Sequence, residues 1–191
     1  AEYCNSGLWN DAVTVLLQAN TAASDKANIS PIIYYYLGYF AEKLGDPEKA
    51  AGYRQQAELQ SPDYVFPFQA EVISVLRSAI EADPKDVRAP YYLGNLLFDW
   101  QPEEAVKLWE KSVGLNPTAI ALRNLAQAYS HKSGDESRAK AIMYMEKAVA
   151  LPNPDPTHFA ELDLLYKTAG TAVEKRLALL EKNQKIVEKK D

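Results

Sequence analysis

Two stretches of the chain, residues 31–62 and 89–117, carry the same order of large apolar and small residues. The shared positions are Tyr34, Leu37, Gly38, Ala41, Gly45, Ala50, Ala57 and Pro62 in the first stretch, and Leu93, Gly94, Leu97, Ala105, Trp109 and Pro117 in the second. A repeated unit constrains the fold strongly, because one helical hairpin cannot bury its apolar face alone and must stack on its neighbours.

The small residues and the prolines have separate physical roles. Gly38 and Gly94 lack a β-carbon, so a second helix can approach the first one closely at these positions. Pro62 and Pro117 follow the second half of each unit, where a residue without an amide hydrogen ends a helix. The sequence therefore predicts an all-α fold built from antiparallel helix pairs.

A period of about 34 residues with small residues at the helix contacts is typical of the tetratricopeptide repeat, and the chain resembles that family. The resemblance implies an α-solenoid of stacked antiparallel helix pairs that winds into a right-handed superhelix. It also implies a protein that binds other molecules and does no chemistry.

Once the register is known, further copies can be placed along the whole chain. We expect one helical array over residues 1–191, with full repeats at 31–62, 89–117 and 118–154, a partial repeat at 1–20, a half repeat at 63–86 and a weaker repeat at 156–185. The chain starts within a repeat, so we expect it to be a fragment of a larger protein.

The half repeat departs from the pattern because its first helix is missing. Residues 63–68 stand in that place, and Pro67 disfavours helical geometry at Phe66. We expect Tyr64, Phe66 and Phe68 to fill the apolar gap, and the array to be irregular there.

Composition limits the classes of partner and compartment. The formal charge is −5 from 21 basic and 26 acidic residues, and no basic stripe suggests nucleic-acid binding. No apolar run is long enough for membrane insertion. A single cysteine, Cys4, excludes an internal disulfide framework, and a reducing cytoplasmic setting is favoured, although the compartment and the oligomeric state stay open.

No pattern in the sequence indicates catalysis, a metal or another cofactor. His131 and His158 are the only histidines, and neither has a second histidine or cysteine at metal-ligand spacing. No glycine-rich phosphate loop is present. We therefore expect a chain that is not an enzyme.

Several runs also resemble the tetratricopeptide segment of a family of large bacterial proteins that is known only as a domain of unknown function. These runs are SPDYVFPFQAEVISVLRSAI, PYYLGNLLFDW, EEAVKLWEKS, LRNLAQAY and ELDLLYKTAG. In such proteins, as the resemblance implies, a β-rich region similar to carbohydrate-active folds precedes the helical array. The resemblance adds a context and no mechanism.

The tetratricopeptide resemblance also implies where a ligand binds, because the first helix of each pair lines the concave face in that family. Transferring the register predicts a ligand-binding groove formed by Tyr35, Tyr39, Tyr91, Asn95, Arg123 and Gln127, with Phe98 and His131 one turn further along. These side chains should be partly exposed, while Leu37, Leu93 and Leu125 should be buried. Asn95 and Arg123 alone are too few for the charged clamp by which some members bind a C-terminal carboxylate.

Two functions of different classes follow. The leading one is a protein-interaction scaffold that binds a peptide or a partner domain on the concave face. The alternative is an intramolecular structural module that supports the β-rich, carbohydrate-enzyme-like domain of the same full-length protein.

Overall fold

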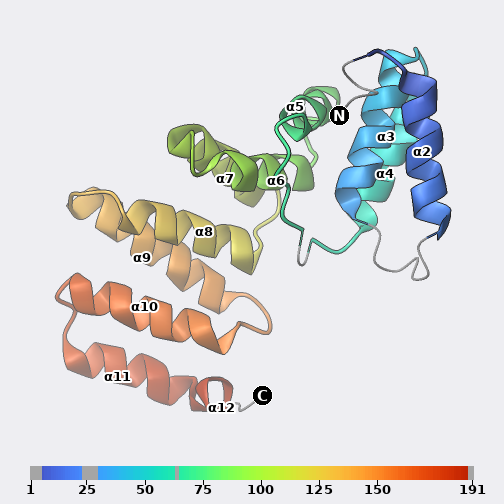
Figure 1. The fold of residues 1–191 in the computed structure, drawn as a ribbon. Coiled ribbons are helices and arrows are strands. Elements are labelled where there is room, and N and C mark those ends of the chain that lie inside the picture. Colours follow the sequence, from blue (N-terminus) through green and yellow to red (C-terminus); the bar gives the residue numbers. More distant parts are fainter. Residues whose placement is uncertain (1–5, 23–29, 63–64, 189–191) are drawn as a thin grey trace. The chain divides into compact units, whose positions relative to one another are not determined.

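The computed structural model describes residues 6–22, 30–62 and 65–188 (Figure 1). Every regular element within these ranges is a helix and none is a strand, so the predicted all-α class is confirmed. The helices of the structure group into two compact units, Ala1–Leu115 and Asn116–Asp191, and the single array stays a prediction.

The first unit contains two helix pairs and two further helices. Its elements are α2 (Trp9–Ala22), α3 (Pro31–Lys43), α4 (Pro47–Leu59), α5 (Val72–Ala82), α6 (Arg88–Leu97) and α7 (Pro102–Leu115). Helix α3 pairs with α4, and α6 pairs with α7. Helix α5 has no partner of its own and packs against both α3 and α6, while α2 packs against α3.

The second unit continues the same scheme. Its elements are α8 (Ala119–Ser130), α9 (Asp135–Ala150), α10 (Pro156–Thr168), α11 (Val173–Lys182) and α12 (Gln184–Val187). Helix α8 pairs tightly with α9, and α10 packs on α9 (Figure 1). Helix α11 buries none of its residues, and the bidentate ion pair of Arg176 with Asp163 joins it to α10 at 2.8 and 2.7 Å.

Two of the helix-to-helix turns use one backbone motif. After α3, Gly45 takes a φ of +77°, and the Asp46 N–H donates to the Ala41 carbonyl at 2.9 Å. After α10, Gly170 takes a φ of +74°, and the Thr171 N–H donates to the Tyr166 carbonyl at 2.9 Å. Glycine suits both positions because a β-carbon disfavours this left-handed conformation.

Small residues bring the paired helices into close contact, as the repeat pattern requires. A β-carbon built on Gly94 of α6 would lie 2.5 Å from Nε1 of Trp109 and 3.1 Å from the carbonyl oxygen of Ala105, both on α7. The Trp109 indole N–H donates to Oδ1 of Asn95 at 3.0 Å, which holds the ring against α6. The α6–α7 pair therefore has no space for a side chain at position 94.

The expectation that aromatic residues fill a gap at positions 63–68 is wrong for the two phenylalanines. Phe66 is 71% exposed and Phe68 is 83% exposed, while Tyr64 lies outside the described residues. No gap is left for them to fill, because α5 buries Val72 and Leu76 and packs directly against α3 and α6.

A buried carboxylate joins three parts of the first unit. Asp86, in the turn between α5 and α6, is 1% exposed and accepts hydrogen bonds at 2.8 Å from the backbone N–H groups of Arg88 and Ala89. The Tyr35 hydroxyl of α3 donates to both of its oxygens, at 3.0 and 2.9 Å. Asp86 therefore caps α6 and ties its start to α3.

The contact at Gly94 gives a prediction about stability. Gly94→Ala should lower the free energy of unfolding by about 1–3 kcal/mol, because the new methyl group collides with Trp109 and with the α7 backbone. Gly52→Ala in α4 is the matched control, since its new methyl group meets no atom within 4 Å and should stabilise the helix by about 0.5–1 kcal/mol. Chemical denaturation of both variants measures the difference, and equal effects would contradict the packing.

Asp86 gives a prediction about pH. Burial, opposed by the hydrogen bonds from Ala89, Tyr35 and Arg88, raises the pKa of Asp86 above its usual value of 3.8. The stability that this carboxyl contributes is therefore complete below pH 3.8 and is lost as the pH rises through its folded-state pKa.

Asp86→Asn removes this titration. The free energy of unfolding of the variant, minus that of the parent chain, should therefore increase as the pH rises above 3.8. Urea denaturation of both chains over a pH series measures this difference. The titration of the other carboxyl groups is common to both chains and largely cancels. A difference that stays constant or falls with pH would show that the folded state does not favour the protonated carboxyl.

Candidate interaction surface

The predicted groove residues all lie on the first helices of their pairs or directly after them. In the first unit they come from α3 and α6, and in the second unit from α8. Leu37, Leu93 and Leu125 beside them are at most 1% exposed, as the register requires.

Two of the predicted residues are not available to a ligand. Tyr35 is 1% exposed and Tyr91 is 5% exposed, so the expectation of partial exposure is wrong for both. Helix α5 packs against α3 and α6, and the Tyr35 ring lies edge-on to Tyr92 of α6, with 6.3 Å between the ring centroids. Burial, with the nearby charge of Asp86, raises the pKa of Tyr35, which stays a neutral hydrogen-bond donor.

The other residues of the first unit are half-buried and make contacts within the fold. The Tyr39 ring is edge-on to Trp9, with 6.2 Å between the ring centroids. The Lys43 ammonium lies 5.0 Å from the centroid of the Tyr39 ring. Asn95 accepts the Trp109 indole hydrogen bond. Phe98 packs on the same Trp109 ring, with 5.0 Å between the ring centroids. Part of each side chain remains accessible.

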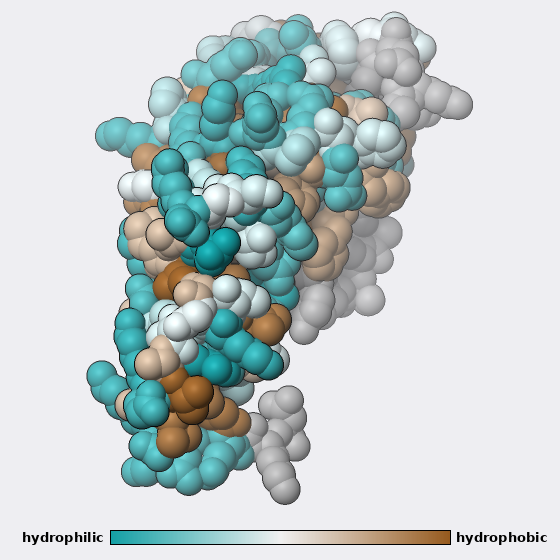
Figure 2. All heavy atoms as spheres, turned by 90° about the vertical axis from the view of Figure 1, so that its left-hand side faces the viewer, coloured by the Kyte–Doolittle hydropathy of each residue, from teal (hydrophilic) through white to brown (hydrophobic). Residues whose placement is uncertain are grey.

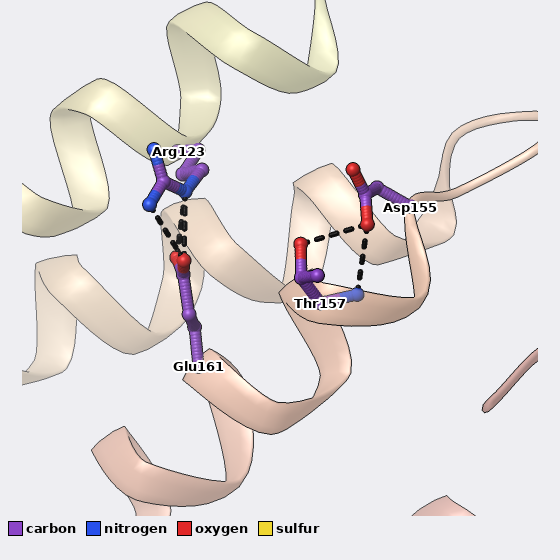
Figure 3. A network of polar contacts seen from close by, with 4 residues as sticks. All are labelled: Arg123, Asp155, Thr157 and Glu161. Atoms are coloured by element: carbon purple, nitrogen blue, oxygen red, sulfur yellow. Dashed lines mark hydrogen bonds and ion pairs between the residues drawn. The ribbon is translucent and has the colours of Figure 1, made fainter. Parts of the chain in front are cut away.

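In the second unit, Arg123 joins the first helices α8 and α10. Its Nε donates to both carboxylate oxygens of Glu161, at 2.9 and 2.8 Å, and its Nη2 donates to Oε1 at 2.6 Å (Figure 3). This ion pair raises the pKa of Arg123 and leaves the two groups with no net charge. Six residues before Glu161, Asp155 caps α10 by accepting from the Thr157 N–H at 2.8 Å.

The same two helices border a pocket of about 210 Å³. It is lined by Ala126, Gln127, Ser130, His131, Met145, Glu161, Leu164 and Leu165. Ala126 and Met145 are buried and form an apolar floor, while Gln127 and His131 are exposed at the rim. The predicted groove residues Gln127 and His131 therefore line one pocket. Arg123 does not line it but is ion-paired with Glu161, which does.

Sequence reasoning missed the α10 side of this pocket. Leu164 is 59% exposed and lies two residues after Leu162, as Gln127 lies two residues after Leu125. Extending the register to the weaker fourth repeat would have found it. Figure 2 shows hydrophobic residues gathered in the lower part of the face drawn, and the exposed hydrophobic residues of α10 and α11 include Leu164, Val173 and Leu177.

Charge is distributed unevenly between the helices of a pair. Arg123 is the one charged residue of α8, and it is paired with Glu161. The second helix α9 instead carries Asp135, Glu136, Arg138, Lys140, Glu146 and Lys147. The surface of α8 is therefore rich in apolar and hydrogen-bonding groups and poor in net charge, whereas α10 also carries Asp163 and Lys167.

Two larger hollows, of about 590 and 560 Å³, lie in the first unit and contain none of the predicted groove residues. One borders the start of α7 and includes Glu103, Glu104 and Lys107. The other lies beside the second helix α4 and includes Asp46 and Lys49, which form an ion pair at 2.8 Å. The lining of the first hollow is mostly charged, whereas the lining of the second also includes the apolar side chains of Val13, Leu17, Ala41 and Leu44.

Comparison with known proteins identifies the fold. No protein-family model matches the chain. Its structure is similar to the crystal structure of MamA, with a TM-score of 0.52 and 21% sequence identity over 96% of this chain and 94% of that one. The chain has a tetratricopeptide-like fold. At this level of identity the likeness extends to the fold alone.

Neither a metal site nor a membrane-spanning helix is found in residues 6–22, 30–62 and 65–188. Within these ranges no three histidine, cysteine, aspartate or glutamate side chains gather as a metal ion requires. No helix there is both long and apolar enough to cross a bilayer. Cys4 lies outside the described residues.

The α8–α10 ion pair gives a testable energy. A double-mutant cycle of Arg123→Gln and Glu161→Gln should yield a coupling of about 0.5–1 kcal/mol in the free energy of unfolding, because both partners are still partly exposed. Urea denaturation of the parent, the two single variants and the double variant measures it. A coupling of zero would mean that this contact does not hold α8 and α10 together in solution.

Proposed function

We propose that the chain is a non-catalytic protein-interaction scaffold that binds a peptide or partner domain on the surface of its first helices. The observation that carries the proposal is the pocket between α8 and α10, with its apolar floor and polar rim on a surface of little net charge. The tetratricopeptide-like fold supports a scaffold by analogy alone. The pocket carries the argument, because one fold can host many functions and a function belongs to a site.

The pocket has the chemistry that recognition of a peptide side chain needs. Burying an apolar side chain against Ala126, Met145 and Leu164 contributes about 25 cal/mol per Å² of area removed from water. The exposed Gln127 amide and His131 imidazole offer donors and acceptors for the neighbouring peptide groups. Such a combination of apolar contact and a few polar groups is usual in binding sites.

The ion pair between Arg123 and Glu161 supports binding in a different way. It links α8 and α10 in the free protein, so a ligand does not have to order these two helices against each other. Preorganisation of this kind lowers the conformational entropy that is lost on association.

The side chains around the pocket also support a role without chemistry. His131 is exposed and forms no hydrogen bond from its imidazole to the part of the chain that the structure describes, so nothing there orients it as a general base. The other histidine, His158, is buried on α10.

The experiment selects ligands on the purified chain from a phage-displayed peptide library and measures their affinities by calorimetry. Leu164→Ser should weaken a selected peptide by about tenfold or more, because an exposed apolar anchor is lost from the pocket wall. Gln127→Ala should weaken it less, by the loss of about one hydrogen bond.

The matched control is Met143→Ser, which changes another exposed apolar residue of the same unit, on the second helix α9. Affinity should be unchanged in this variant, and all three variants should melt as the parent does. Peptides that bind the Leu164 and Met143 variants equally well would exclude the α8–α10 pocket as the binding site.

A further inference from the structure

The lining of the α8–α10 pocket contains one half of an ion pair. Glu161 of α10 lines the pocket, whereas its partner Arg123 of α8 does not. The other lining residues are apolar, or are neutral hydrogen-bonding residues such as Gln127 and Ser130. A side chain that enters the pocket therefore comes next to the acidic member of the pair.

The Glu161 carboxylate can accept one more hydrogen bond. Its Oε1 accepts from both Nε and Nη2 of Arg123, at 2.9 and 2.6 Å, whereas Oε2 accepts only from Nε, at 2.8 Å (Figure 3). No other group in the described part of the chain donates to Oε2. A carboxylate has about four acceptor positions, two on each oxygen, so one position on Oε2 remains for a ligand.

The size of the pocket suits one side chain with an apolar body. Its volume of about 210 Å³ is below the roughly 300–1,000 Å³ of sites that enclose a whole small molecule. The buried Ala126 and Met145 form its floor, and the exposed Leu164 forms part of its wall. The occupant must therefore place apolar surface against these three residues.

Charged side chains fit this lining poorly. The carboxylate of an acidic residue is repelled by Glu161. The ammonium or guanidinium of a basic residue meets a carboxylate that Arg123 already neutralises, and Arg123 repels a second cation beside it. The occupant is therefore a neutral side chain.

Purely aliphatic side chains and phenylalanine leave the carboxylate without a new partner. They would displace water from Glu161, whose side chain is 28% exposed, and return no hydrogen bond for the one that is lost. Tyrosine and tryptophan instead combine a large apolar ring with a neutral O–H or N–H donor. Methionine, here Met145 of the floor, also makes favourable contacts with aromatic rings.

We propose that the α8–α10 pocket selects a tyrosine or tryptophan side chain of the partner, whose O–H or N–H donates to Oε2 of Glu161. The inference rests on the function proposed above and adds the chemical class of the residue that the pocket takes. Glu161 thus has two roles: it holds α8 through Arg123, and it determines specificity.

The test uses a peptide library displayed on phage. The library is first depleted on the Leu164→Ser variant and then selected on the parent chain, so that the recovered peptides depend on the pocket. They should share a tyrosine or a tryptophan. Replacing that residue by phenylalanine or by naphthylalanine, respectively, keeps the ring and removes the donor. The affinity measured by calorimetry should then fall about tenfold or more, as expected for a hydrogen bond to a charged group.

Two variants separate the acceptor from the ion pair. Glu161→Leu and Arg123→Leu lose the same ion pair, but only the first loses the carboxylate. The ratio between the affinities of the donor peptide and the donor-free peptide should stay about tenfold or more in Arg123→Leu and approach one in Glu161→Leu. Glu161→Gln, which keeps the shape and a neutral acceptor, should give an intermediate ratio. Both altered side chains are partly exposed, so each variant should unfold cooperatively in urea.

Three outcomes would overturn this specificity and leave the proposed function standing. The first is that peptides dependent on Leu164 are anchored by aliphatic or charged residues. The second is that the donor-free peptides bind the parent as tightly as the donor peptides do. The third is that Glu161→Leu and Arg123→Leu change the affinity ratio equally, which would give Glu161 a structural role only. Recovery of no peptide that depends on Leu164 would overturn both proposals.

Discussion

The close approach of two helices at a position without a side chain is the constraint on which the α3–α4 and α6–α7 pairs depend. Gly94 shows it most directly, because a single added carbon would lie 2.5 Å from the Trp109 indole. Alanines on the facing helices serve the same end: Ala105, Ala141 and Ala148 are fully buried. Helices at this distance exclude water along their whole contact, so a chain of modest hydropathy can bury a continuous core between them.

In addition to this packing, individual polar contacts join particular helices. Asp86 connects the start of α6 to α3 through the Tyr35 hydroxyl. This contact buries the Asp86 carboxyl, and the burial raises its pKa. Arg123 and Glu161 connect α8 to α10 with charges that remain partly in water. The first contact therefore makes stability depend on pH, while the second holds the edges of a pocket in place.

The proposed binding site, the α8–α10 pocket, combines an apolar floor with an ion pair at its edge. In the function that we propose, this pocket receives a side chain from a ligand, and the pairing of Arg123 with Glu161 favours partners of little charge.

The sequence by itself determined the all-α class, the helix contacts at Gly94 and Ala105, and the burial of Leu37, Leu93 and Leu125, because these depend on local periodicity and on side-chain size. It could not determine the exposure of Tyr35, Tyr91, Phe66 and Phe68. The burial of Tyr35 and Tyr91 depends on where α5 packs, and only the tertiary structure decides that this unpaired helix packs directly against α3 and α6 and leaves Phe66 and Phe68 exposed. Glu161 was missed for a different reason: it contacts Arg123 from 38 residues further along the chain, and the groove prediction was not extended to the fourth repeat.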